Sequence, residues 1–426
     1  MTPLNISTPL PIMKGEIRTH LHDPKQLEKL YQTNKASFKQ AFGVLYPEIK
    51  GDTLADCWYE RLNYESNEIY WGSAKELIVV IMASLVAGLI VKLPAFFDID
   101  EDFFYPRNIG FIVFPLLTTY FAWKNRLSAL KITFLAAAMI GSLVFINSLP
   151  IVEKSDTLIL SCIHLPLFLW SMLGFAFVGG EGNNADRRLG FLTYNGDLLV
   201  MTTLIVIAGG ILSGITIGLF SLIGLDIEQL YIEHVGLMGL AAAPIVATYL
   251  TQSNPQLVGK VSPVIARIFS PLVLVMLVIY LVAIVYSGKN PYNDREFLLL
   301  FNVLLIGVIA IIFFSIAEAA KTTKSRTEMG ILFLLSVITI VVNGIALSAI
   351  LFRISEWGIT PNRAAVLGAN VLILVNLLLV AVQLFRVLSN KVTVTAVGKA
   401  IAVYLPVYSI WAIIVVFVFP YVFGFR

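Results

Sequence analysis

The stretch at residues 353–363, RISEWGITPNR, places two arginines and a glutamate between two long apolar runs. The guanidinium groups of Arg353 and Arg363, beside the amino end of the following helix, are suited to bind a phosphate or a carboxylate, and Glu356 would orient one of them. Trp357 is typical of a membrane interface. In the alternative interpretation, both arginines reach lipid headgroups and Glu356 only pairs with one of them.

The same stretch carries local signals for a turn between two helices. Gly358 can take the left-handed conformation that ends a helix, Thr360 can cap the next helix, and Pro361 fits its first turn. The sequence therefore predicts a tight helical hairpin here.

Three ionisable residues are expected at or near membrane depth. His164 lies beside Pro166, whose missing amide frees a carbonyl that an imidazole can satisfy; a proton- or ligand-binding role is the alternative. Glu233 and His234 open a later apolar run. They form either a proton-linked pair or two water-facing groups at the outer interface.

A charged cluster falls in one predicted inner connection. Both a solvated, self-paired loop and a functional cluster fit its composition. Its members are Glu181, Asp186, Arg187, Arg188 and Asp197.

The sequence contains none of the common motifs of metal, nucleotide or serine-hydrolase sites, such as HExxH, CxxC, a phosphate-binding glycine loop or GxSxG. We therefore expect no metal and no cofactor, and the balance leans away from an enzyme. The net charge of +3 is small and dispersed, so no nucleic-acid partner is expected.

The composition is that of an integral membrane protein. Hydrophobic residues make up 58% and charged residues 13% of the 426 positions, against roughly half and a quarter in soluble domains. We predict an all-α, polytopic transmembrane helix bundle of about eleven spans, because a crossing helix needs roughly 20 apolar residues. The second span, which contains Pro115, is the weakest. The predicted spans are 77–97, 109–123, 129–149, 157–178, 198–225, 231–250, 268–286, 297–317, 330–352, 364–385 and 400–425.

Small and polar residues inside the spans predict helix packing. Gly210, Gly214 and Gly218 recur four apart, so we expect them to form a helix contact surface. Amide side chains in or near the spans are expected to form hydrogen bonds between helices. These are Asn147, Asn302, Asn343, Asn370, Asn376 and Gln383.

Residues 1–75 are predicted to form a cytoplasmic or membrane-surface segment, separate from a transmembrane domain at 76–426. Short amphipathic helices are expected, the first capped by Asp23 with Pro24 in its first turn. Their apolar residues are too few for an independent core, so their apolar faces should pack on the membrane surface or on the membrane domain. Membrane lipid is thus an expected partner, and the segment can also bind a protein partner.

The run RISEWGITPNR, with an apolar span on each side, resembles the signature of a bacterial membrane-protein family known only as domain of unknown function 4153. The runs at 45–65, 186–200 and 261–274 are also similar to what members would carry, so the resemblance covers most of the chain. Trp357 stands where tyrosine is more often expected. The resemblance implies a polytopic protein of the bacterial inner membrane, without an assigned activity or cofactor.

The connections that share a side with the amino terminus hold most of the lysines and arginines, which predicts a cytoplasmic amino terminus and a periplasmic carboxy terminus. Three functions stay open. The leading one is transport of a small or amphipathic solute, or support of envelope assembly. The others are an intramembrane enzyme acting on a lipid-linked substrate, and a scaffold that recruits a partner through its amino-terminal helices.

Overall fold

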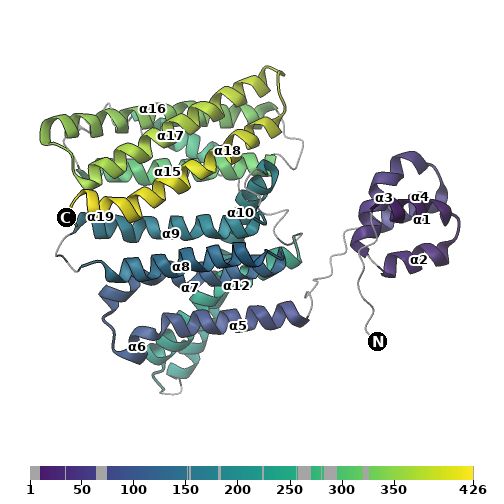
Figure 1. The fold of residues 1–426 in the computed structure, drawn as a ribbon, viewed down its shortest axis with the longest axis horizontal. Coiled ribbons are helices and arrows are strands. Elements are labelled where there is room, and N and C mark those ends of the chain that lie inside the picture. Colours follow the sequence, from purple (N-terminus) through teal and green to yellow (C-terminus); the bar gives the residue numbers. More distant parts are fainter. Residues whose placement is uncertain are drawn as a thin grey trace. The chain divides into compact units, whose positions relative to one another are not determined.

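The computed structural model describes residues 10–33, 35–63, 74–150, 152, 155–180, 184–222, 225–255, 257, 270–279, 281–282, 295–319 and 326–425. These residues are largely helical, and no strand occurs among them. The chain divides into two compact units, Met1–Ile69 and Tyr70–Arg426 (Figure 1). Each unit is described by itself below.

The amino-terminal unit is a bundle of short helices. They are α1 (Leu10–Thr19), α2 (Pro24–Thr33), α3 (Lys35–Ile49) and α4 (Thr53–Asn63). The carboxylate of Asp23 accepts hydrogen bonds from the backbone amides of Lys25 and Gln26 at 3.0 and 3.1 Å, so the predicted cap of α2 is confirmed.

This unit has an apolar core of its own. Phe38, Phe42 and Leu45 of α3 are buried together with Trp58 of α4, and the Phe38 and Trp58 ring centroids lie 5.2 Å apart. The expectation that these helices lack an independent core is therefore wrong. A few aromatic side chains suffice, because each buries roughly 150–250 Å².

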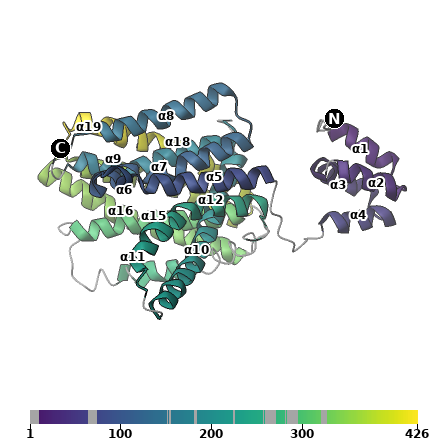
Figure 2. The same ribbon diagram turned by 90° about the horizontal axis from the view of Figure 1, so that it is seen from below.

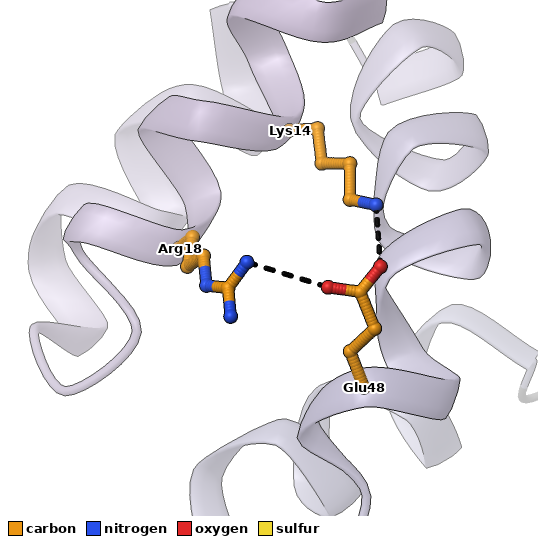
Figure 3. Close-up of polar contacts among 3 residues, drawn as sticks. All are labelled: Lys14, Arg18 and Glu48. Atoms are coloured by element: carbon orange, nitrogen blue, oxygen red, sulfur yellow. Dashed lines mark hydrogen bonds and ion pairs between the residues drawn. The ribbon is translucent and has the colours of Figure 1, made fainter.

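Charged side chains join α1 to α3 on the surface of the unit. The Glu48 carboxylate accepts a hydrogen bond from Lys14 at 2.6 Å and pairs with Arg18 at 3.3 Å (Figure 3). The hydrogen bond and the charge of Lys14 hold the pKa of Glu48 below its ordinary value.

The second unit is built from long apolar helices that lie side by side (Figures 1 and 2). Its elements are α5 (Ala74–Val91), α6 (Leu93–Phe97), α7 (Glu101–Lys124), α8 (Ala129–Ser148), α9 (Asp156–Phe177), α10 (Ala185–Leu222), α11 (Glu228–Tyr231), the π-helical turn η1 (Ile232–Gly236), α12 (Leu237–Ser253), α15 (Arg295–Ala319), α16 (Arg326–Trp357), α17 (Pro361–Leu388), α18 (Val394–Ile413), the π-helical turn η2 (Ile414–Val418) and α19 (Phe419–Val422).

Seven helices in the described part of the chain are long and apolar enough to cross a membrane. They cover Ala129–Ser148, Asp156–Phe177, Ala185–Gly218, Glu228–Ser253, Arg326–Trp357, Pro361–Leu388 and Val394–Val422. Two shorter apolar helices, Ser270–Ile279 and Phe301–Ala317, fall inside two further predicted spans. The all-helical, multi-pass class is consistent with these helices, whereas the full set of eleven spans stays a prediction.

The first two predicted spans differ in detail from the helices found there. The first is broken at the buried Lys92, where α5 gives way to α6. The second is longer than predicted, because α7 continues through Pro115 without a break. Arg107 and Asn108 make α7 less apolar than the other long helices, and both are buried within the protein.

The two largest apolar cores among the described residues of the second unit lie in different sets of helices. One is formed mainly by α15, α16, α17 and α18, and the other mainly by α5, α7, α9 and α12. Trp170 of α9 packs against both. Helix α9 therefore contacts both cores, and polar side chains of α9 lie next to α18.

Candidate functional site: asparagines inside the bundle

Three asparagines are buried among α16, α17 and α18. Asn343 belongs to α16, while Asn370 and Asn376 belong to α17, and their exposed fractions are 0%, 1% and 0%. All three lie in the central half of their helices, and the residues flanking them include Val342 and Leu377 of the apolar core. Polar groups at this depth are rare in membrane proteins and serve either helix packing or a solute path.

Two of these asparagines bridge neighbouring helices. The Nδ2 of Asn343 donates to the backbone carbonyl of Asn370 at 3.2 Å. The Nδ2 of Asn376 donates to the hydroxyl of Tyr408 in α18 at 3.0 Å. The predicted hydrogen bonds between helices are confirmed for this pair.

Each of these three asparagines also keeps hydrogen-bonding capacity that the described structure does not use. The Oδ1 atoms of Asn343 and Asn376, and both the Oδ1 and Nδ2 of Asn370, are buried without a partner in the described structure. An unpaired buried polar group costs about 1–3 kcal/mol, so such atoms indicate ordered water or a ligand. Three acceptors and one amide donor suit a small solute that carries hydroxyl, amine or amide groups.

Polar contacts also connect α18 and α10 to α9. The Ser171 hydroxyl of α9 donates to the Ser409 hydroxyl of α18 at 2.8 Å. The indole Nε1 of Trp170 donates to the Oδ1 of Asn195 in α10 at 2.9 Å. The interior of the bundle is therefore polar at several helix contacts, and the three asparagines are among the buried residues of the described structure that keep unpaired polar atoms.

The charged stretch that connects α16 to α17 forms the predicted hairpin. Gly358 has a φ of +74°, and the Thr360 hydroxyl accepts from the Arg363 amide. The Arg363 guanidinium donates to the carbonyls of Trp357 and Gly358 at 2.9 and 2.7 Å. It therefore caps the carboxy end of α16 instead of pairing with the exposed Glu356.

Trp357 is the other shared contact of this hairpin. The guanidinium carbons of Arg353 and Arg363 each lie 5.6 Å from the centre of its ring. Two arginines and one indole thus form a local cluster at a helix end. An anion-binding role for this cluster stays a prediction.

The ionisable residues expected at membrane depth form hydrogen bonds mainly within their own helical segments. The Nδ1 of His164 hydrogen-bonds the Leu160 carbonyl at 2.9 Å, which is not the carbonyl that Pro166 frees, four residues before the proline. Glu233 accepts from Gln229 at 2.9 Å, and the Nδ1 of His234 contacts the Leu230 carbonyl. Glu233 and His234 are exposed in the π-helical turn η1.

The carbonyl of Glu233 accepts a hydrogen bond from the buried Lys92 at 3.0 Å. A π-helical turn has an irregular backbone. This contact joins η1 to the point at which α5 ends and α6 begins. Sequence patterns had not singled out Lys92.

The predicted inner-loop cluster is partly dispersed. Glu181 lies outside the described residues. Arg187 donates to the Val178 carbonyl at the end of α9, at 3.0 Å, and Arg188 donates to the Ala402 carbonyl of α18, at 3.2 Å. Asp186 is exposed and Asp197 is half-buried.

The glycine stripe of α10 does not contact another helix within the described protein. A Cβ atom added at Gly210, Gly214 or Gly218 would meet nothing within 4 Å, and the surrounding turns are mostly exposed. The described part of the chain therefore supplies no partner for this stripe, and the helix contact surface stays a prediction. Spacing alone shows that a backbone could approach closely, and not that one does.

Arg107 is a buried cation that the sequence patterns did not identify. Its side chain is 5% exposed, its Nη1 donates to the Phe103 carbonyl at 3.3 Å, and its Nε and Nη2 have no hydrogen-bond partner in the described structure. Beside it, Asn108 of α7 and Asn147 of α8 exchange two amide hydrogen bonds. An arginine near the start of an apolar helix was the available sequence signal.

Among the described residues, no group of three or more His, Cys, Asp or Glu side chains is arranged to hold a metal ion. Comparisons of the chain with known protein families, with characterised proteins and with solved structures found no match.

Proposed function

We propose that the second unit transports a small polar or amphipathic solute, which binds between α16, α17 and α18. The observation that carries this proposal is the set of unpaired amide atoms at Asn343, Asn370 and Asn376. Solute sites of secondary transporters lie near the middle of the bilayer, next to irregular helices. The π-helical turn η2, which follows Pro406 in α18, is such an irregularity.

The proposed location is a bacterial cytoplasmic membrane, with the amino terminus in the cytoplasm and the carboxy terminus in the periplasm. This location rests on the distribution of lysines and arginines and on the resemblance to domain of unknown function 4153. Membership of that family is part of the same proposal.

Cysteine accessibility tests the transport proposal, because the measurement does not depend on the identity of the solute. Asn370→Cys would be introduced into a background in which Cys57 and Cys162 are changed to serine, and intact cells would be treated with a small, membrane-impermeant thiol reagent. We expect Asn370→Cys to react, because a transporter must admit water to its solute site in one of its states. Leu377→Cys is the control, since this side chain is fully buried in the same helix but apolar.

Equal protection of Asn370→Cys and Leu377→Cys, from both sides of the membrane, would leave the asparagines as packing residues and refute the proposal. A second accessible cysteine at Asn343, in α16, would place the water path between the two helices.

A second function, recruitment of a protein partner, is favoured by one observation. The amino-terminal unit covers its own apolar core, so it needs no membrane to bury these residues. If this unit only recruits a partner, then deleting residues 1–69 should leave the labelling of Asn370→Cys unchanged. Lost labelling at matched expression would instead make the unit part of the transport machinery.

A further inference from the structure

A pocket of about 460 Å³ opens beside the carboxy end of α7. Its charged walls are Glu76 from α5, Lys124 from α7 and Arg126 from the turn that follows. Leu127 and Ile132 contribute apolar walls, and Trp123 completes the rim. The pocket therefore joins a charged end to an apolar side.

The charges in this pocket favour an anion. Lys124 donates to the Tyr120 hydroxyl and to the side-chain Oε1 of Gln252, each at 3.3 Å; both partners are neutral, and the carboxylate that acts on its charge is Glu76. Two cations thus face the single carboxylate of Glu76. For the side chain of Arg126, no hydrogen bond or ion pair occurs in the described part of the protein.

Arg126 occupies a backbone conformation that an arginine rarely adopts. Its φ is +50°, and it closes α7 with hydrogen bonds from its own amide to the Trp123 carbonyl and from the Leu127 amide to the Ala122 carbonyl. Glycine or asparagine is usual at this position. Asn390, with a φ of +55°, holds the equivalent place after α17. The unusual backbone conformation singles out the Arg126 side chain as a candidate for a function.

The start of α8 adds to the positive character of this region. The hydroxyl of Ser128 at the amino end of α8 makes no capping hydrogen bond, so the first amides of this 20-residue helix keep their capacity to donate. Ile132, in the first turn of α8, also lines the pocket.

The apolar side of the pocket continues onto the outer face of α8. Leu130, Ile132 and Phe134 are 81%, 45% and 51% exposed, as expected for side chains that contact lipid tails. Trp123 is 46% exposed and is suited to the headgroup level. A ligand with a phosphate and acyl chains could place the phosphate at the charged end of the pocket and the acyl chains along its apolar side.

We propose that this pocket binds the phosphate of an anionic phospholipid. The guanidinium of Arg126 and the ammonium of Lys124 hold the phosphate oxygens, and the acyl chains lie along Leu127 and the outer face of α8. Basic pockets between membrane helices recognise anionic headgroups in this way. The lipid site is independent of the transport proposal.

The test compares the purified full-length chain in nanodiscs of dioleoyl phosphatidylcholine with and without dioleoyl phosphatidylglycerol, by lipid retention in native mass spectrometry and by thermal unfolding. Wild type should retain phosphatidylglycerol and unfold at a higher temperature when it is present. Arg126→Gln, which keeps the turn but removes the charge, should weaken retention by about tenfold.

Arg126→Gly distinguishes the contribution of the Arg126 side chain to lipid binding from its effect on the stability of the turn. It should raise the unfolding temperature in pure phosphatidylcholine, because glycine relieves the left-handed strain, and it should abolish the response to phosphatidylglycerol. Asn390→Gly is the matched control, which relieves the same kind of strain and should keep the lipid response. A wild-type response in both Arg126 variants would overturn the proposal, as would an equal response of wild type to inorganic phosphate.

Discussion

The side chain of Arg363 stabilises the backbone at the carboxy end of α16. Its guanidinium donates to two carbonyls at the end of α16, where the last carbonyls of a helix lack partners within the helix. The exposed Glu356 makes no such contact in the described part of the chain. Arg363 therefore stabilises the end of α16, whereas Glu356 does not.

Arg363→Gln should consequently lower the free energy of unfolding by about 1 kcal/mol, the usual worth of a hydrogen bond exchanged with water. Glu356→Gln should be silent. The measurement is thermal unfolding of each purified variant. If Glu356→Gln proves as harmful as Arg363→Gln, then Glu356 orients one of the guanidinium groups of the hairpin, as the anion-site prediction requires.

The carboxylate of Glu48 gives the amino-terminal unit a defined response to pH. Lys14 lowers the pKa of Glu48 in the folded state, so the pair stabilises the unit fully above the unfolded pKa of about 4.3. This stabilisation is lost as the pH falls through the lower folded value.

Calorimetry of the amino-terminal transition should therefore show Lys14→Met to be less stable than wild type at pH 6, and the difference should shrink as the pH falls below the unfolded pKa of about 4.3. Lys25→Met, which removes an exposed charge of the same sign from the start of α2, is the control and should follow the wild-type profile. Parallel pH profiles of wild type and Lys14→Met would rule out the contribution of this pair.

At the scale of the elements, side chains from distant parts of the sequence donate hydrogen bonds to backbone carbonyls that proline leaves without a partner. Proline frees the carbonyl four residues before it. In α18 this is the Ala402 carbonyl, which accepts from Arg188, and in η2 it is the Val416 carbonyl, which accepts from Ser161 at 3.0 Å. These contacts fasten the carboxy-terminal helices to α10 and α9.

Close helix packing depends on individual glycines that have a partner. A Cβ atom at Gly368 of α17 would collide with the Trp411 ring of α18, whereas one at Gly214 of α10 would meet open space. Gly368→Leu should therefore destabilise the protein by about 1–3 kcal/mol, as overpacking does. Gly214→Leu should change stability by less than about 0.5 kcal/mol.

Thermal unfolding of both purified variants tests this contrast. A large loss for Gly214→Leu alone would restore the glycine stripe as a contact surface, with a second molecule supplying the partner helix.

The elements that could be predicted from the sequence are those whose stabilising contacts join residues a few positions apart. Gly358, Thr360 and Pro361 encode their hairpin locally, and the carboxylate of Asp23 reaches amides only two and three residues away. The contact between Arg188 and Ala402 spans 214 positions. No local pattern contains such a partner, which is also why the unpaired amides of the asparagine cluster could not be foreseen.

For the whole molecule, α7 decides whether the two termini lie on opposite sides if the other ten predicted spans cross the membrane. Its 24 residues extend about 36 Å, which is enough to cross a hydrocarbon layer of roughly 30 Å. Its polar residues Arg107 and Asn108 are buried against protein, so they do not oppose a crossing as lipid-exposed charges would. We expect α7 to span the membrane despite its modest apolar character.

Reporter fusions test this expectation at three places. A fluorescent protein joined near Lys14 should be fluorescent, as it is in the cytoplasm, and alkaline phosphatase joined after Arg426 should be active, as it is in the periplasm. A phosphatase inserted at the turn after Lys124 should be inactive, because a crossing by the first predicted span followed by a crossing of α7 returns this turn to the cytoplasm. If the two termini were found on the same side, with the turn after Lys124 outside, then α7 would lie within the protein without crossing, and the lipid pocket at its carboxy end would face the outer leaflet.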